Sequence, residues 1–171
     1  MAGISPPRPL AADDDRESFD CGRESLNLWF RCHAWHNQES DVSRTSVICD
    51  AGMGKIVGFT SLSAAQVERA YLPKSGQRNR PDPIPAVLLG QLAVDRRQQG
   101  NGYAASLMYF ALTTAVRFSQ GIGCFGVLTH PLDDGVRAFY GQFGFETLPY
   151  DPRRSMIVRI TDLIKNGFSR Q

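Results

Sequence analysis

The chain has 171 residues, and 42% of them are hydrophobic, which suits one globular domain with a sizeable core and excludes a disordered protein. No apolar run approaches the roughly 20 residues of a membrane span. The N-terminal residues contain no apolar signal-peptide block, so we expect a cytoplasmic protein that does not bind a membrane.

The net charge is only +2, but basic residues gather in two stretches, at 69–97 and 153–171. Clustered bases on a nearly neutral protein favour a local site for a polyanion, although a solvated face would have the same composition. The four cysteines form no CxxC pair and no zinc-binding spacing. We therefore expect reduced, packed thiols and no metal site.

The first third of the chain predicts a helix and a hairpin. Residues 1–12 are rich in Pro and Ala and are expected to be extended. Asp20 is placed to cap a helix over about 22–37. Residues 45–49 and 55–64 are rich in apolar and β-branched side chains and flank a Gly-containing turn, which predicts two strands joined as a hairpin.

The rest of the chain alternates strands and helices after a Pro-rich surface loop at 71–85. Periodicity predicts a strand at 87–94, a helix at 102–119, a strand at 124–129, a helix at 133–143 and a strand at 155–161. This order predicts an α/β domain in which helices flank a mixed sheet.

One part of this order has the pattern of a phosphate-binding turn. The apolar run 87–94 leads into the Gly-containing turn 95–102, and an amphipathic helix follows. Such a turn directs backbone N–H groups outward at the positive end of the helix dipole, which binds phosphate. The predicted ligand is a phosphorylated cofactor.

Two common phosphate loops do not fit this turn. An ATP or GTP loop needs Lys-Ser or Lys-Thr after its last glycine, whereas Tyr103 follows Gly102. A dinucleotide fingerprint needs a third glycine, which Ala105 would replace, and an acidic residue about 20 residues further on, but 118–130 contains none. The turn does fit the pattern R/Q-x-x-G-x-G/A, as Arg97-Gln98-Gln99-Gly100-Asn101-Gly102.

That pattern resembles the acetyl-CoA pyrophosphate loop of the GNAT superfamily of N-acetyltransferases. Further along, Tyr140-Gly141-Gln142-Phe143-Gly144-Phe145 resembles the Y-x-x-x-G-F end of the signature in the superfamily's second CoA-contacting helix. The resemblance implies one GNAT domain over 1–171, with a mixed, mostly antiparallel central sheet flanked by helices. It also implies acetyl-CoA as co-substrate.

The resemblance further implies which residues bind the cofactor. The turn would hold the pyrophosphate, and unpaired backbone groups near the end of the preceding strand would hold the pantetheine and the carbonyl. Asp133 stands where many members have an Asn that touches CoA, and it could cap a helix as well. The expected cofactor-binding residues are Leu92, Ala93, Val94, Arg97, Gln99, Gly100, Asn101, Gly102, Tyr103, Ala104, Ala105 and Asp133.

Forming an amide from a thioester requires a neutral amine, a polarised carbonyl and a proton for the departing thiolate. Tyr140 is the candidate catalytic acid, and its alternative role is that of a packed aromatic with its hydroxyl at the rim. His33, His36 and His130 are candidate bases, and each is more often a structural histidine. We expect His33 to lie on the apolar face of the predicted first helix. His130 precedes a proline after a strand end, where active-site residues often lie.

A more specific resemblance, to one group within the superfamily, extends over Phe19–Leu163. It is carried by Phe19-Asp20-Cys21-Gly22, Ser43-Arg44-Thr45 and residues 55–62 and 80–95. These segments look like the GNAT toxins of bacterial toxin–antitoxin modules, which acetylate the free α-amine of an amino acid charged on tRNA. The resemblance implies charged tRNA as acceptor, a ribbon-helix-helix antitoxin as partner, and a homodimer. The expected RNA contacts are Lys74, Arg78, Arg80 and Arg96, whereas Gln91 departs from the basic residue expected in many relatives.

Two alternatives stay open. The chain could acetylate a small amine or a protein N-terminus, or it could be an idle GNAT domain that only binds nucleic acid or a partner. The intact phosphate turn together with Tyr140 argues against an idle domain, because a binding module needs neither.

Overall fold

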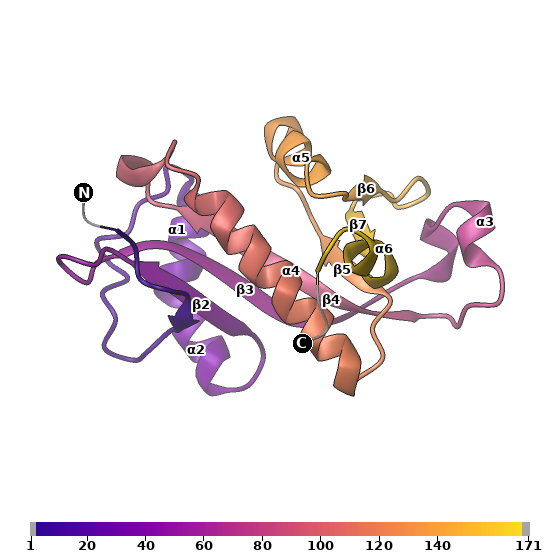
Figure 1. Cartoon of the computed structure of the whole chain (residues 1–171), viewed down its shortest axis with the longest axis horizontal. Coiled ribbons are helices and arrows are strands. Elements are labelled where there is room, and N and C mark those ends of the chain that lie inside the picture. Colours follow the sequence, from indigo (N-terminus) through magenta and orange to yellow (C-terminus); the bar gives the residue numbers. More distant parts are fainter. Residues whose placement is uncertain (1–2, 169–171) are drawn as a thin grey trace. The chain divides into compact units, whose positions relative to one another are not determined.

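The computed structural model describes residues 3–168, and its seven strands form one sheet in the order β1-β2-β3-β4-β5-β7-β6 (Figure 1). The pairs β1–β2, β2–β3, β5–β7 and β6–β7 are antiparallel, and β4–β5 is parallel. The predicted α/β class with a mixed sheet is confirmed. The strands are β1 (Arg8–Pro9), β2 (Arg44–Cys49), β3 (Ile56–Val67), β4 (Ile84–Val94), β5 (Gly126–Thr129), β6 (Glu146–Thr147) and β7 (Met156–Arg159).

Six helices and two short 3₁₀ turns complete the described chain. None of the helices among the described residues has both the length and the apolar character needed to cross a membrane. The helices are α1 (Glu24–Cys32), α2 (Ala34–Glu39), α3 (Lys74–Gln77), α4 (Tyr103–Gly121), α5 (Asp134–Gly141) and α6 (Ile160–Lys165), and the 3₁₀ turns are η1 (Arg69–Tyr71) and η2 (Arg96–Gln98).

The chain divides into two compact units, each built from two separate stretches. The first unit comprises Met1–Ser63 and Gly90–Ala111, and the second comprises Ala64–Leu89 and Leu112–Gln171. A single domain over the whole chain stays a prediction.

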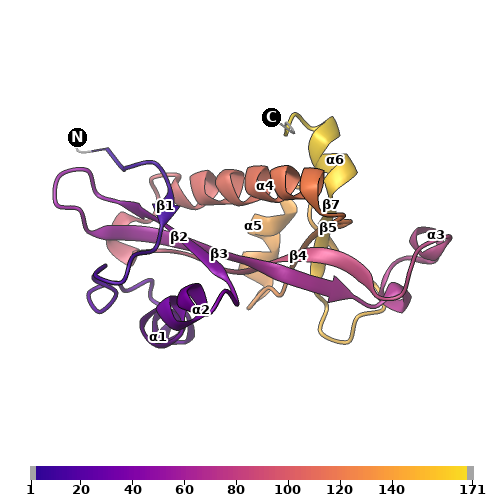
Figure 2. The same ribbon diagram turned by 90° about the horizontal axis from the view of Figure 1, so that it is seen from below.

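In the first unit, alternate side chains of the strands feed two separate cores, as the two-residue period of a strand requires. Val47 and Phe59 pack in the core that also contains Phe30 of α1, whose ring is stacked on that of Phe59 at 4.1 Å. Ile48 and Val57 pack in the core that contains Leu107 of α4. Figure 2 shows α1 and α2 on one face of β2 and β3 and the first half of α4 on the other.

The second unit has its own core around β5 and β7. Val67, Ile84, Leu128, Leu148 and Ile157 are buried together there. β5 pairs with both β4 and β7 and packs in this core. These contacts fix the position of the end of β5, and His130 follows directly after it.

Most predicted elements are found, with ends shifted by at most three residues, but three expectations are wrong. The helix predicted over 22–37 is interrupted at His33, whose φ of −120° is not helical. Asp20 does not cap it, because Arg23 is the N-cap residue and has no side-chain cap bond. The loop predicted over 71–85 contains α3 and the start of β4.

Two smaller differences concern the ends of the chain. The strand predicted to reach 161 ends at Arg159, where α6 begins. Within the N-terminal segment, Arg8 and Pro9 pair with β2 as an edge strand, and Ala12 lies in a turn.

Candidate functional site

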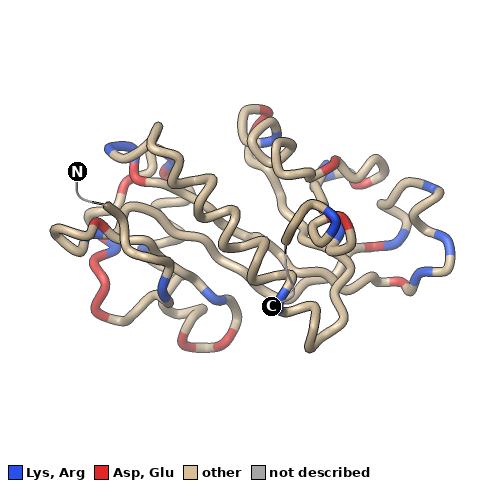
Figure 3. Tube along the Cα trace, viewed as in Figure 1, with Lys and Arg blue, Asp and Glu red and all other residues tan. Residues whose placement is uncertain are grey.

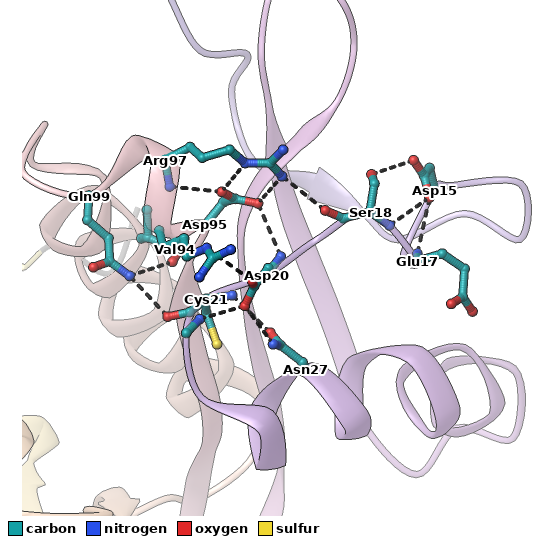
Figure 4. A network of polar contacts seen from close by, with 12 residues as sticks. Asp15, Glu17, Ser18, Asp20, Cys21, Asn27, Val94, Asp95, Arg97 and Gln99 are labelled. Atoms are coloured by element: carbon teal, nitrogen blue, oxygen red, sulfur yellow. Dashed lines mark hydrogen bonds and ion pairs between the residues drawn. The ribbon is translucent and has the colours of Figure 1, made fainter.

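A buried carboxylate organises the turn that follows β4. Asp95 is 2% exposed and accepts hydrogen bonds from the backbone N–H groups of Asp20 at 3.1 Å and Arg97 at 3.0 Å. The Arg97 guanidinium donates to both carboxylate oxygens, at 2.9 and 2.8 Å (Figure 4). The Arg97 side chain is the largest cause that lowers the pKa of Asp95, to about 2. Asp95 is therefore ionised at neutral pH.

Two further side chains tie the same turn to the segment before α1. Gln99 Nε2 donates to the carbonyl oxygens of Cys21 at 3.2 Å and Val94 at 3.0 Å. Arg96 Nε lies 3.0 Å from a carboxylate oxygen of Asp20, and the Arg96 N–H donates to the Asp20 carbonyl. The side chains of Arg97 and Gln99, both expected to bind cofactor, are thus used to shape the turn, and the Arg97 N–H is itself bonded to Asp95.

The turn itself is glycine-dependent. Gly100 and Gly102 have φ values of +85° and +80°, a region that favours glycine, and no heavy atom lies within 4 Å of where a Cβ would stand. Tyr103 begins α4, in which the Ser106 N–H is bonded to the Gly102 carbonyl. The first N–H groups of a helix have no acceptor within it. The beginning of α4 therefore offers space and donors to an anion.

The end of β4 lies beyond its pairing with β5. The two strands pair only at Val87 and Leu88, and at the next position the Thr129 hydroxyl, rather than a backbone group, donates to the Leu89 carbonyl at 3.0 Å. The expected cofactor contacts Leu92, Ala93 and Val94 lie on the part of β4 that continues past this point.

Tyr140 lies on α5 in the second unit and is 7% exposed. Asp133 caps this helix by accepting from the Val136 N–H at 2.8 Å, so its predicted capping role is confirmed. Burial raises the pKa of Tyr140, and a side-chain hydrogen bond with Thr129 opposes that rise. The hydroxyl is consequently protonated at neutral pH and held at the end of β5, as an acid would require.

The three histidines differ in their surroundings. His33 and His36 are exposed, so the expectation that His33 lies on an apolar face is wrong. His130 is half-buried in the second unit, and its Nδ1 lies 2.7 Å from Ser155 Oγ. Burial is the largest cause that lowers the pKa of His130.

The predicted RNA contacts are not equally available. Arg80 donates from Nε to the Gly76 carbonyl at 2.7 Å and lies over the Phe125 ring at 4.4 Å. Arg96 is paired with Asp20 in the first unit. Lys74 and Arg78 are exposed at α3 in the second unit, where Figure 3 shows basic residues near the tip of this segment.

The cysteines carry free thiols, of which Cys21 and Cys49 are buried. Within residues 3–168, His, Cys, Asp and Glu side chains form no group of three or more that could hold a metal ion.

Comparison with known proteins identifies related chains along nearly the whole length. Residues 10–145 match the Acetyltransferase (GNAT) family. The tRNA-acetylating toxin of Mycobacterium tuberculosis is 40% identical over 158 residues, which cover 92% of this chain and 94% of that protein.

Two solved structures have the same fold over the full chain. The structure of AtaT complexed with acetyl-methionyl-tRNAfMet has a TM-score of 0.88 and 31% identity, covering 98% of this chain and 100% of that one. A Tyr-to-Phe mutant of AtaT bound to the C-terminus of the antitoxin AtaR and to acetyl-CoA has a TM-score of 0.80 and 25% identity, covering 96% of this chain and 98% of that one.

Replacing Asp95 by Asn should destabilise the protein in a pH-dependent way. The pKa of Asp95 is lowered from 3.8 to about 2, so its charge stabilises the fold above pH 4. That contribution, about 2 kcal/mol, should be lost as the pH falls from about 4 to 2.

Urea unfolding at pH 7 and at pH 2.5 measures this effect. The wild type should exceed Asp95→Asn in free energy of unfolding by about 2 kcal/mol at pH 7 and by much less at pH 2.5. An equal difference at both pH values would show that the charge of Asp95 is unimportant for stability.

Proposed function

We propose that this chain, which belongs to the GNAT family of acetyltransferases, moves the acetyl group of acetyl-CoA to the free α-amine of an aminoacyl-tRNA and so blocks translation as the toxin of a toxin–antitoxin module. The observation that carries the proposal is the 40% identity, over 92% of the chain, to a tRNA-acetylating toxin. The solved AtaT complexes with an acetylated aminoacyl-tRNA and with acetyl-CoA support the same acceptor and donor.

The proposed cofactor site uses the backbone of the turn and of β4. The N–H groups over Gln99–Ala105 bind the pyrophosphate, which fits the open space above Gly100 and Gly102. Backbone groups of Leu92–Val94 hold the pantetheine and the thioester carbonyl, since this part of β4 runs past its pairing with β5. Asp133 is proposed as a further CoA contact at the start of α5.

The proposed chemistry asks one proton transfer of the protein at the leaving group. The amine nitrogen attacks the thioester carbon, the C–N bond forms and the C–S bond breaks. Tyr140 gives its hydroxyl proton to the departing thiolate. Its raised pKa keeps the hydroxyl protonated at neutral pH, so the proton is present when the C–S bond breaks. Tyr140→Phe, the same kind of exchange as in the Tyr-to-Phe mutant of AtaT, tests this role.

A cognate antitoxin of the ribbon-helix-helix type, a homodimeric state and a place in the cytoplasm complete the proposal. The AtaT structure with the C-terminus of AtaR supports an antitoxin partner. The exposed side chains of Lys74 and Arg78 are the main proposed tRNA contacts. Arg80 and Arg96 are proposed as further contacts, although both are also bonded to groups of the protein.

Gly102→Glu should abolish acetyl-CoA binding, because it places a negative side chain where the pyrophosphate would lie. Gly102→Ala is the control, since it meets the same unfavourable φ of +80° without adding charge. Calorimetry should find measurable affinity for the Ala variant and none for the Glu variant. Equal affinities in two folded variants would place the pyrophosphate elsewhere.

Tyr140→Phe keeps the buried ring and removes only the hydroxyl. Turnover should fall by about 10²–10⁴-fold, the usual size of general acid catalysis, while acetyl-CoA affinity stays unchanged. Tyr150→Phe, at an exposed tyrosine, should leave turnover unchanged. A loss of less than about threefold for Tyr140→Phe would reduce this residue to a packing role.

The function itself is tested with labelled acetyl-CoA and total charged tRNA, with free amino acids and small amines assayed beside them. We expect label in the charged tRNA and its loss when the aminoacyl ester is hydrolysed. Label only in small amines, with none in charged tRNA, would overturn the toxin proposal.

Measuring tRNA affinity at several salt concentrations tests the proposed tRNA contacts. Replacing both Lys74 and Arg78 by Ala should weaken tRNA binding and reduce its salt dependence, because fewer counterions are released, without changing acetyl-CoA affinity. Lys55→Ala removes an exposed charge from the turn between β2 and β3 and should change neither. Wild-type tRNA affinity and salt slope in the double variant would show that α3 does not touch the RNA.

A further inference from the structure

The second unit contains a pocket of about 310 Å³ that the proposed acid and cofactor residues do not use. Its floor includes the apolar side chains of Leu88 and Leu128. Its polar walls are formed by Glu68, Tyr71, His130, Asp151, Arg153 and Ser155. The pocket therefore combines an apolar floor with several titratable groups, and His130 is its one imidazole.

His130 is held by a short chain of hydrogen bonds. Its Nδ1 lies 2.7 Å from Ser155 Oγ, and Ser155 is also bonded through its side chain to the Asp151 carboxylate. Because a carboxylate only accepts, the Ser155 hydroxyl donates to Asp151 and its oxygen accepts from His130 Nδ1–H. That arrangement selects the neutral tautomer in which Nε2 carries the lone pair. Ser155 and Asp151 are buried, which fixes the orientation of the ring.

The pocket and Tyr140 approach β5 from opposite faces. Leu128 lines the pocket, whereas the next residue, Thr129, bonds Tyr140 and donates to the Leu89 carbonyl. Successive side chains of a strand face opposite sides of the sheet. His130, two residues after Leu128, lines the pocket again. A group held where β4 and β5 stop pairing would thus meet Tyr140 from one face and His130 from the other.

We infer that this pocket receives the acceptor amine and that His130 Nε2 takes the proton that the amine nitrogen loses as the amide forms. The inference rests on the proposed acetyl transfer and adds its general base. Among the charged groups that line the pocket, the two carboxylates of Glu68 and Asp151 outnumber the one guanidinium, that of Arg153, which favours entry of an ammonium group over a neutral alcohol.

The step is balanced by two protons that move in opposite directions. The nitrogen lone pair forms the C–N bond, the electrons of the C–S bond leave with the sulfur, and the nitrogen proton passes to His130. The sulfur receives the proton of Tyr140. Exchange with water then returns the imidazolium and the phenolate to their starting forms.

The charged groups around His130 set the direction of its titration. Burial and the positive charge of Arg153 lower the pKa of His130, and the negative charge of Asp151 raises it by less. Glu68 and Tyr71 are the other titratable groups in the pocket walls. The net lowering leaves the imidazole neutral at pH 7, as a base must be, and places its titration below about pH 6.5.

The test is the pH dependence of kcat/KM for acetylation of charged tRNA. In the wild type, both the α-amine, with a pKa near about 8, and His130 must be neutral, so log kcat/KM should rise with a slope approaching 2 at the acid end. His130→Gln should lower kcat/KM by about 10²–10⁴-fold at pH 7 and reduce that slope to 1, with acetyl-CoA affinity unchanged. His33→Gln, at an exposed histidine, is the matched control and should behave as wild type.

Ser155→Ala supplies a second, independent measurement. Ser155 Oγ accepts a hydrogen bond from Nδ1–H, and this bond is stronger when the ring is charged, so it favours the imidazolium. Its loss should therefore move the acid limb to lower pH while His130 remains. A folded His130→Gln variant with wild-type rate and slope, or an unmoved limb in Ser155→Ala, would overturn the inference. Failure of the wild type to acetylate charged tRNA would instead overturn the proposed function, so the two failures are distinguishable.

Discussion

The conformation of the candidate cofactor turn depends on the hydrogen bonds and the ion pair that the ionised Asp95 carboxylate makes. A buried charge is costly unless it is paired and fully hydrogen-bonded, and Asp95 meets this requirement through Arg97 and the backbone of Asp20. The same contacts fix the course of the chain from the end of β4 through η2. Gly100 and Gly102 can then take their positive φ values at the one place where α4 begins.

The second constraint is the early end of the β4–β5 pairing. A backbone ladder that continued past Leu88 would use the polar groups of β4 that the proposed cofactor site requires. Instead the Thr129 side chain takes the Leu89 carbonyl, and the same threonine contacts Tyr140. Thr129, the last residue of β5, thereby connects the end of the β4–β5 pairing to the candidate acid Tyr140. The next residue, His130, turns to the opposite face of the sheet.

The arginines show why charge composition overstates a binding surface. Arg80 is engaged by the Gly76 carbonyl and by the ring of Phe125, and Arg96 and Arg97 are engaged by carboxylates. A guanidinium has several donors, so it can bond to a group of the protein and to a ligand at the same time. A carboxylate paired with it, however, offsets its positive charge and weakens its attraction for a polyanion. Of the four proposed RNA contacts, Lys74 on α3 and Arg78 directly after α3 are exposed, although Lys74 Nζ lies over the Tyr150 ring at 5.7 Å.

The sequence by itself determined five of the seven strands (β2, β3, β4, β5 and β7), the long helix α4 and the glycine turn, because these depend on periodicity and local backbone conformation. The two-residue strands β1 and β6 are too short to carry a periodic signal. Residues 97–102 and Tyr140 could be chosen from sequence because the resemblance rests on short contiguous patterns. An Asp directly after a strand, as at position 95, is a sequence signal for a cap, and Asp95 does cap η2. The break at His33 and the short α3 had no periodic signal strong enough to reveal them.

Only the tertiary structure decided which side chains the turn and the pocket bring together. Asp95 meets Asp20 across 75 positions of sequence, and His130 meets Ser155 across 25. No sequence pattern links residues that are so far apart in the chain. Each contact exists because buried strands and their connections place the two segments side by side. Local forces act between near neighbours in the chain and so can be read in order, whereas the partners of a buried charge or an imidazole are selected by packing, which no stretch of sequence contains alone.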